Sequence, residues 1–292
     1  MNDFLPVCRR DMERRGWDQL DFLFVTGDAY VDHPTFANGL IARWMEFLGY
    51  RIGVIAQPDW RGRSDFEAMG EPRLAVFVSA GNLDSMLNKL TASRNKRGHD
   101  AYSPNGEAGH RPDRATIVYC NRVREIWGRK PLIVGGIEAS MRRFSHYDYW
   151  SDKVRRPMLA DCKADLLIYG MGELQLKEIA ARLEAGVPAR EIDSVPGTCV
   201  MKKSKPGDCV EIPPLRGGRG RQNGLCRSVP PAKPGTGPHP RHGGGAKSRR
   251  PLHGAEQAHA PADDGRIRPG QRAAVYPRSP SHVRRPRRSP RH

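Results

Sequence analysis

The sequence predicts an α/β fold, a doubly wound and mostly parallel sheet, over about its first 200 residues. Two observations predict it: short apolar runs recur along this part of the chain, and patterns with helical spacing lie between them. The runs are continuous rather than alternating, as is typical of strands that are covered on both faces. Alternation of strand and helix favours a parallel sheet with helices on both sides.

The expected strands are six short apolar runs. They are Phe22–Val25, Ile52–Ala56, Leu74–Val78, Thr116–Cys120, Leu132–Val134 and Leu166–Tyr169. A first helix is expected between Pro34, which suits a first turn, and Gly49, which suits the position after a last turn. Its apolar positions at helical spacing are Phe36, Leu40, Ile41, Trp44, Phe47 and Leu48.

Two further helices are expected along the chain. Asn82 could cap a short helix that turns its apolar side chains inward. Those side chains are Leu83, Met86, Leu87 and Leu90. The pattern over Glu173–Ala185 predicts another helix, which Gly186 would end. Its apolar positions are Leu174, Ile179, Ala180 and Leu183.

The charge of the chain is divided unevenly along its length. The 292 residues include 49 Lys and Arg against 32 Asp and Glu, a formal net charge of +17. Residues 1–215 hold 31 basic and 29 acidic side chains, whereas residues 216–292 hold 18 basic and 3 acidic ones. A nearly neutral body therefore precedes a basic tail, residues 216–292. The charge alone would suggest nucleic acid or an anionic membrane as a partner.

Several classes of protein are excluded. No apolar run approaches the roughly 20 residues that a membrane-spanning helix needs. The N-terminal sequence mixes charges of both signs and has no apolar core, so no signal peptide is expected. The six cysteines, at positions 8, 120, 162, 199, 209 and 226, form neither a disulfide framework nor a CxxC metal site. We expect a cytoplasmic protein with reduced and mostly buried thiols.

Glycine and small polar residues follow several of the expected strands. These turns are Thr26–Asp28, Ser79–Gly81, Gly135–Glu138 and Gly170–Glu173. Ligands of such sheets bind outside the carboxyl ends of the strands, where glycine lets backbone N–H groups approach them. The same turns could instead be only tight connections from strand to helix. Neither GxGxxG nor GxxxxGK[ST] is present, so no dinucleotide or P-loop site is assigned.

Two polar clusters also stand out. In the first, Asp28, Tyr30, Asp32 and His33 follow the first strand. A carboxylate beside a histidine could serve acid–base chemistry or metal binding, or Asp32 could cap the helix that begins near Pro34. The second cluster comprises Glu138, Arg142, Arg143, His146, Tyr147, Asp148, Tyr149, Trp150 and Asp152. It could line a pocket or cover the edge of the sheet as a packed loop.

These turns and clusters supply the candidate residues for a small-molecule site. They are Gly27, Asp28, Asp32, His33, Gly135, Gly136, Glu138, His146, Asp148, Gly170, Gly172 and Glu173. No catalytic residue and no metal ligand is assigned. No membrane and no specific nucleic acid is expected as a partner.

The tail does not read as a domain. It holds 12 Gly, 12 Pro and one aromatic residue, Tyr276, in 77 residues. With no apolar periodicity to form a core, the cost of ordering its backbone is not offset, and we expect it to be disordered. A basic disordered arm could contact phosphate backbones nonspecifically.

Several segments resemble the N-terminal part of the YgiQ-type radical SAM proteins, also called the UPF0313 family. They are FLPVCRRDMERRGWDQLDFLFVTGDAYVDHPTF from Phe4, GYRIGVIAQPDW from Gly49, NKRGHDAYSPNG from Asn95, and KPLIVGGIEASMRRFSHYDYWSDKVRRPMLADCKADLLIYGMGE from Lys130. The resemblance continues to about Leu215 and covers essentially the whole body. It implies a cobalamin-binding-domain-like, Rossmann-like α/β domain over residues 1–200, with residues 201–215 beginning a linker to a radical SAM barrel.

The resemblance also implies cofactors that the chain does not provide for. The family's barrel would bind a 4Fe–4S cluster through a CxxxCxxC motif, and the cluster would cleave S-adenosylmethionine. None of the six cysteines has this spacing. We therefore expect that the chain is a fragment without the barrel, with no cofactor and no radical activity of its own. The DxHxxG motif that presents a cobalamin-ligating histidine is also absent, because Asp32 and His33 are adjacent.

The resemblance stops abruptly after Leu215. Codons for Arg216–Arg227, read one nucleotide later, can give EEVAGDKTAYA, and codons for Pro261–Gly270 can give PLTTAEFDRV at the same offset. Both are similar to the segments that the family places here. The hypothesis is that residues 216–292 are an out-of-frame translation of a GC-rich gene.

Overall fold

The computed structural model of the 292-residue chain describes residues 4–204, 211–212 and 273–274. Most of the tail therefore lies outside the described residues, and the expectation that it is disordered stays a prediction. Within the described part, no helix combines the length and the apolar character that crossing a bilayer requires.

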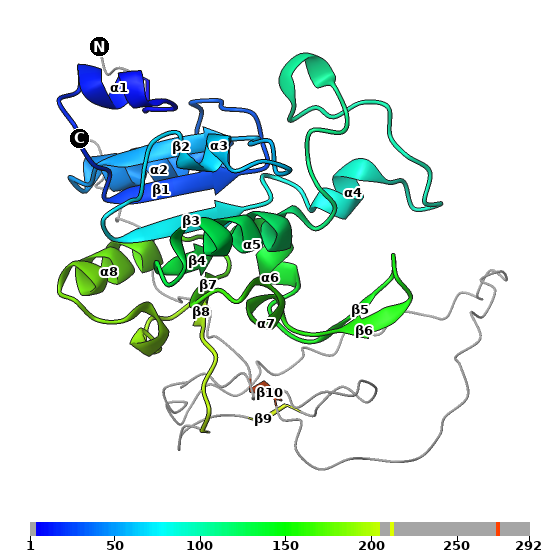
Figure 1. The fold of residues 1–292 in the computed structure, drawn as a ribbon. Helices are drawn as coiled ribbons and strands as arrows, with labels where there is room; N and C mark the ends of the chain where they lie inside the picture. The colour runs from blue at the N-terminus through cyan, green and yellow to red at the C-terminus, as the bar shows by residue number, and fades with distance from the viewer. Residues whose placement is uncertain (1–3, 205–210, 213–272, 275–292) are drawn as a thin grey trace, which may run out of the picture.

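A six-stranded sheet forms the centre of the body (Figure 1). Its strand order is β2-β1-β3-β4-β7-β8, and every pair is parallel except the edge pair β7–β8. The strands are β1 Phe22–Thr26, β2 Ile52–Ala56, β3 Ala75–Ser79, β4 Leu132–Val134, β7 Leu166–Ile168 and β8 Thr198–Cys199. The predicted α/β class and mostly parallel sheet are confirmed.

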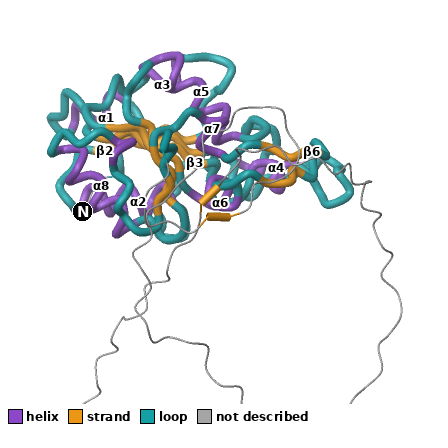
Figure 2. Tube along the Cα trace, turned by 90° about the horizontal axis from the view of Figure 1, so that it is seen from below, coloured by secondary structure: helices purple, strands orange, loops and turns teal. Residues whose placement is uncertain are grey.

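Helices cover both faces of this sheet. Figure 2 shows α3, α5 and α7 on one side of the strands and α2 and α8 on the other. The helices of the body are α1 Arg9–Arg14, α2 Ala37–Phe47, α3 Ser64–Glu67, α4 Ser85–Lys89, α5 Ala115–Trp127, α6 Gly136–Met141, α7 Met158–Cys162 and α8 Glu173–Glu184, with 3-10 turns η1 Pro104–Gly106 and η2 Ala189–Glu191.

The continuous apolar runs form strands because both of their faces are buried. In β1, Phe22 and Phe24 pack into the core beside α2 and α8, whereas Leu23 and Val25 pack into the core beside α5 and α7. All five residues of β1 are buried. A strand with two covered faces gains from an apolar side chain at every position.

Two small antiparallel ladders stand apart from the main sheet. β5 His146–Asp148 pairs with β6 Lys153–Arg155 to form a hairpin. β9 Glu211–Ile212 pairs with β10 Ala273–Ala274, the only residues of the tail that the structure describes.

One predicted strand is wrong. Thr116–Cys120 lies inside helix α5, not in the sheet. The buried positions of α5 include Ala115, Tyr119, Cys120 and Val123, which recur at helical spacing and place one face on the sheet. A short apolar run does not by itself distinguish a strand from a helix that packs on a sheet.

The ends of two predicted helices also differ from expectation. Helix α2 begins at Ala37, after a turn that contains Pro34. Helix α4 is capped by Asp84, whose carboxylate accepts hydrogen bonds from the Met86 and Leu87 amides. Asn82 instead accepts a hydrogen bond from the amide of Ala37, so it caps α2 from another segment.

Some apolar side chains that share helical spacing do not point into the core. Phe47 is 79% exposed, Leu174 is 76% exposed and Leu87 is 47% exposed. Helical spacing predicts which side chains share a stripe, but the width of the covered stripe depends on the packed neighbours.

Candidate functional site

The carboxyl ends of the parallel strands meet at one edge of the sheet. Strand β2 lies on one side of β1 and β3 lies on the other side. The direction in which successive strands are added to the sheet therefore reverses between β1 and β3. Open α/β sheets usually bind ligands in the crevice at such a point. The first place to look for a site is therefore the edge between β1 and β3.

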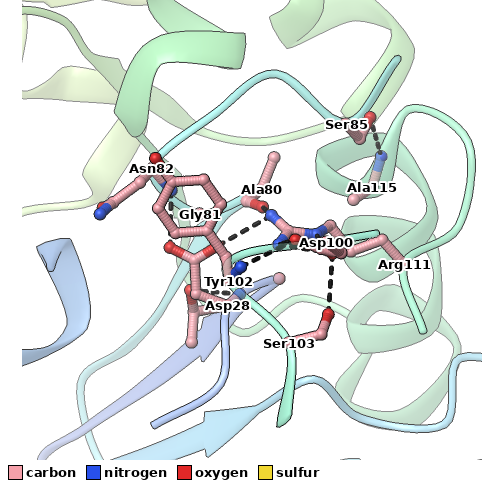
Figure 3. Close-up of polar contacts among 12 residues, drawn as sticks. Asp28, Ala80, Gly81, Asn82, Ser85, Asp100, Tyr102, Ser103, Arg111 and Ala115 are labelled. Carbon is pink, nitrogen blue, oxygen red and sulfur yellow. Dashed lines mark hydrogen bonds and ion pairs between the residues drawn. The ribbon is translucent and has the colours of Figure 1, made fainter. Parts of the chain in front are cut away.

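At that point Arg111 lies beside Asp28, Ala80 and Asp100 (Figure 3). Its guanidinium donates to Asp28 Oδ1 at 2.8 Å and to the carbonyl oxygen of Ala80 at 3.1 Å. It also donates to both carboxylate oxygens of Asp100, from Nη2, at 3.1 and 3.0 Å. A side chain at Gly27 would place its Cβ 2.2 Å from the Ala80 oxygen, so only glycine allows the two strand ends to lie this close.

The carboxylates that hold Arg111 differ in their proton affinity. Burial raises the pKa of Asp28, an effect that outweighs the opposing charge of Arg111 and the hydrogen bond from the Asn82 amide. Burial acts in the same direction on Asp100, but hydrogen bonds from Tyr102 and Ser103 and the charge of Arg111 together lower its pKa. Asp28 is thus part of a buried ion-pair network that anchors the segment around residues 100–111 over the sheet edge.

A pocket of about 260 Å³ lies farther along the same edge, at the ends of β3, β4 and β7. Its lining is mostly apolar, with glycine backbone and a few polar groups. The lining residues include Phe24, Phe77, Ile133 and Ile168 from the strands, Leu40 and Ile41 from α2, Leu176 from α8, and Ser79, Asn82, Gly135, Gly136, Gly170, Met171, Gly172 and Glu173.

Two hydrogen-bonded contacts hold the walls of this pocket together. The Asn82 side chain donates to the carbonyl oxygen of Thr35 at 2.9 Å and accepts from the Ala37 amide at 3.3 Å. The Trp44 indole N–H donates to the backbone carbonyl of Glu173 at 2.7 Å. These contacts join α2 to the β3–α4 connection and to the start of α8.

Glu138 lies behind the edge rather than in the pocket. Its carboxylate accepts from the Ser85 amide at 2.8 Å, from the Ser85 hydroxyl at 2.6 Å and from the Thr116 amide at 3.1 Å. Glu138 is 1% exposed. Its contacts fix the starts of α4 and α5, which is a structural task for a buried carboxylate.

Asp32 and His33 are not among the residues that line the pocket. The Asp32 carboxylate binds the guanidinium of Arg43, whose hydrogen bonds and charge lower the pKa of Asp32. His33 Nδ1 lies 2.9 Å from the Thr35 hydroxyl, in the turn before α2. The two residues are adjacent in sequence but have separate partners.

His146 and Asp148 belong to the β5–β6 hairpin. The Asp148 carboxylate accepts hydrogen bonds from Arg114 and Ser151. His146 Nδ1 lies 3.0 Å from the carbonyl oxygen of Phe144, and burial lowers the pKa of this histidine. The hairpin is packed against the 91–97 segment through the Tyr149 hydroxyl, which donates to the carbonyl of Ala92.

The structure divides the sequence-based candidates into two groups. Those that line the pocket are Gly135, Gly136, Gly170, Gly172 and Glu173. Those that do not line it are Gly27, Asp28, Asp32, His33, Glu138, His146 and Asp148. Ser79 also lines the pocket; it begins the predicted Ser79–Gly81 turn but is not among the candidate residues named from the sequence. No pattern in the sequence around Arg111 indicates that its side chain contacts Asp28 at the end of β1.

The described cysteines do not form a metal site. Cys8 is exposed, whereas Cys120, Cys162 and Cys199 are buried. Over the described residues, no group of three or more His, Cys, Asp or Glu side chains is placed to hold a metal ion. None of these four described cysteines lies at the CxxxCxxC spacing that the family resemblance implies for a cluster.

Comparisons with known proteins match the body. The family model described as Radical SAM N-terminal matches residues 4–226. A UPF0313 protein of Geobacter sulfurreducens is 53% identical over 215 residues, which are 73% of this chain and 36% of that protein. UPF0313 proteins of Clostridium perfringens and Rhodopseudomonas palustris are each 52% identical, over 70% and 72% of this chain and 31% of each relative. The chain thus spans about a third of the length of these relatives.

Among solved structures, the chain is similar to the radical S-adenosylmethionine methyltransferase TsrM from Kitasatospora setae, determined with tryptophan substrate and a SAM analog. The two are 17% identical, with a TM-score of 0.42, over 62% of this chain and 28% of that one. This likeness is too low to support a comparison of sites.

Proposed function

Because the chain belongs to the UPF0313 family and contains its radical SAM N-terminal domain, we propose that residues 4–204 are the accessory α/β domain of a radical SAM enzyme. We propose further that this chain does not itself assemble the 4Fe–4S cluster. The observation that carries the second statement is the spacing of its six cysteines, none of which forms CxxxCxxC.

Anaerobic reconstitution of the full chain with iron and sulfide tests this proposal. The expected result is no stable cluster absorbance and no iron retained after desalting. The Geobacter sulfurreducens relative, treated in parallel, is the positive control. A stable 4Fe–4S signal from this chain would refute the proposal.

A separate proposal concerns the composition of the tail, residues 216–292. We infer that residues 216–292 are an out-of-frame translation, which accounts for 18 basic and 3 acidic residues without a function for the charge. Sequencing the locus on both strands tests the inference. An open frame that encodes this tail as written would overturn it.

We propose as a second function that the body binds a small molecule in the pocket at the ends of β3, β4 and β7. The pocket supports this function because five of the glycine-rich turn residues converge on it with apolar walls around them. The sequence suggested nucleotide-like or corrinoid ligands. A thermal-shift panel of nucleosides, nucleotides, corrinoids and small aromatic compounds tests the proposal, and a flat response across the whole panel counts against it.

A further inference from the structure

The side chains that line the pocket and its volume determine which kind of chemical group it can hold. Phe24 and Phe77 meet edge to face, with ring centroids 6.4 Å apart, at the strand side of the pocket. Leu40 of α2 and Leu176 of α8 line the opposite side. A volume of about 260 Å³ with such walls suits one aromatic ring or a branched aliphatic group.

The pocket has few charged groups in its lining. Its lining contains one charged side chain, Glu173, and no Lys, Arg or His. The Glu173 carboxylate makes no hydrogen bond or ion pair with any described residue, and Lys177, one turn later on α8, is not within ion-pair distance of it. Glu173 is half-buried, so its charge acts partly in a low dielectric.

The partial positive charge at the N-terminal end of α8 does not make the pocket favour anions. The helix is 12 residues long, and the amide groups of its first turn carry partial positive charge. Glu173 lies in that first turn, however, and its carboxylate offsets this charge. A phosphate in the pocket would meet no cationic side chain and would lie close to a carboxylate, which disfavours nucleotides as occupants.

Few other polar groups of the pocket are available to form a hydrogen bond with a ligand. The Asn82 amide is used by Thr35 and Ala37. Ser79 is 2% exposed, and its hydroxyl oxygen accepts from the Gly81 amide at 3.1 Å. The Ser79 hydroxyl hydrogen has no acceptor among the described residues, so it can donate one hydrogen bond to a ligand.

We propose that this pocket binds a compact aromatic or branched aliphatic amine. The ring lies between the phenylalanines and the α2 and α8 side chains, and the ammonium group pairs with the Glu173 carboxylate. The inference rests on the ligand-binding function proposed above and specifies its ligand class. It requires no covalent step and no cofactor.

Three probes that share a phenylethyl group and differ in the charge of the head group test the inference on the full chain. They are 2-phenylethylamine, 2-phenylethanol and 3-phenylpropionate, each titrated by calorimetry. The expected order of affinity is amine, then alcohol, then carboxylate. Glu173→Gln should weaken binding of the amine about tenfold, the size of one charge-assisted hydrogen bond, and should leave the alcohol nearly unchanged.

A matched control separates a local effect from a change in net charge. Glu178→Gln removes the same charge from the same helix at an exposed position that pairs with Arg182, outside the pocket lining. It should leave the affinity of all three probes unchanged. Gly135→Leu, which adds a side chain to the pocket lining, should abolish binding of all three, and circular dichroism checks that this variant folds.

The outcomes distinguish the ligand class from the pocket itself. Equal affinity for the three probes, or amine binding that Glu173→Gln does not weaken, overturns the amine assignment. If Gly135→Leu still abolishes binding in that case, the pocket remains the binding site. If no probe binds and the wider panel is also flat, the ligand-binding function fails together with this inference.

Discussion

Arg111 donates a hydrogen bond to Asp28 at 2.8 Å, although the two residues are 83 positions apart in the chain. The side chains of Arg111 and Asp28 are 4% and 2% exposed. The pair lies where the order of the strands reverses, which is the usual ligand crevice of this fold class. An internal side chain therefore occupies the position at which many related folds hold a ligand, and the pocket is displaced toward β4 and β7.

Removal of Arg111 should destabilise the body strongly. Arg111→Ala leaves Asp28 and Asp100 buried without their cation, which typically costs about 3–5 kcal/mol. Urea unfolding followed by circular dichroism measures the loss. Arg61→Ala is the control, since its ion pair with Asp59 is exposed and should change stability by less than about 0.5 kcal/mol. Similar stability of the two variants would show that the buried network is not needed for folding.

The ion pairs of Asp21 should make the body sensitive to acid. Burial alone would raise the pKa of Asp21, but hydrogen bonds and charge from Arg51 and Arg73 outweigh burial and lower it. A carboxyl with a lowered folded-state pKa stabilises the fold above its unfolded pKa, and this stability is lost as the pH falls through the folded value. Asp21→Asn should therefore flatten the loss of stability that sets in as the pH falls below about 5.

Urea midpoints of the parent chain and Asp21→Asn at a series of pH values measure this effect. The difference between the two should be largest near neutral pH and should shrink as the pH falls. A difference that is constant over the whole range would contradict the assignment of the ion pairs as its cause.

Two adjacent pocket glycines should respond differently to alanine. Gly136 has a φ of +81°, and a Cβ there would lie 2.5 Å from Ser79 Oγ, so Gly136→Ala should cost at least about 1–2 kcal/mol. Gly135 has a φ of −154°, and its Cβ would meet only the Ile168 oxygen, at 3.7 Å. Gly135→Ala should change stability by less than about 0.5 kcal/mol. Thermal denaturation of both variants compares them, and equal losses would contradict this geometry.

The described thiols should differ in reactivity toward iodoacetamide. Cys8 is exposed, whereas Cys120, Cys162 and Cys199 are buried. Burial, together with a hydrogen bond involving Cys120, raises the pKa of Cys162, so little reactive thiolate forms there. Peptide mass spectrometry should find Cys8 alkylated and these three thiols unmodified in the native chain, with all four modified in urea. Native labelling of Cys162 would indicate that α5 and α7 separate readily.

Five strands of the sheet are predictable because burial on both faces gives a continuous apolar run, whereas the two-residue strand β8 has no such run and was not predicted. Phe22–Val25 and Ile52–Ala56 are apolar at every position, and each forms a strand at that place. Thr116–Cys120 has a similar composition but forms part of α5, because its neighbours Ala115 and Val123 extend the apolar face at helical spacing. The longer window from Ala115 to Val123 favours a helix over a strand.

The site is less predictable than the fold because its contacts join distant segments. The glycines after β4 and β7 follow from the rule that ligands bind at carboxyl ends of strands, and they do line the pocket. Asp28 satisfies the same rule, yet its partner Arg111 lies in a long connection whose path no local pattern specifies. A polar residue at a strand end therefore identifies the correct edge of the sheet without showing whether it faces a ligand or another side chain.

The indole of Trp44 and the carbonyl of Glu173 that it contacts are separated by 129 positions. One wall of the pocket comes from residues 34–41 and the other from residues 168–176, so a chain emerging from the ribosome cannot form the pocket until the later segment has been made. A ligand held there would bind only bodies in which β7 and α8 have docked, and mass action would favour that state over partly assembled ones. Occupancy of the pocket would thus stabilise the state in which β7 and α8 have docked.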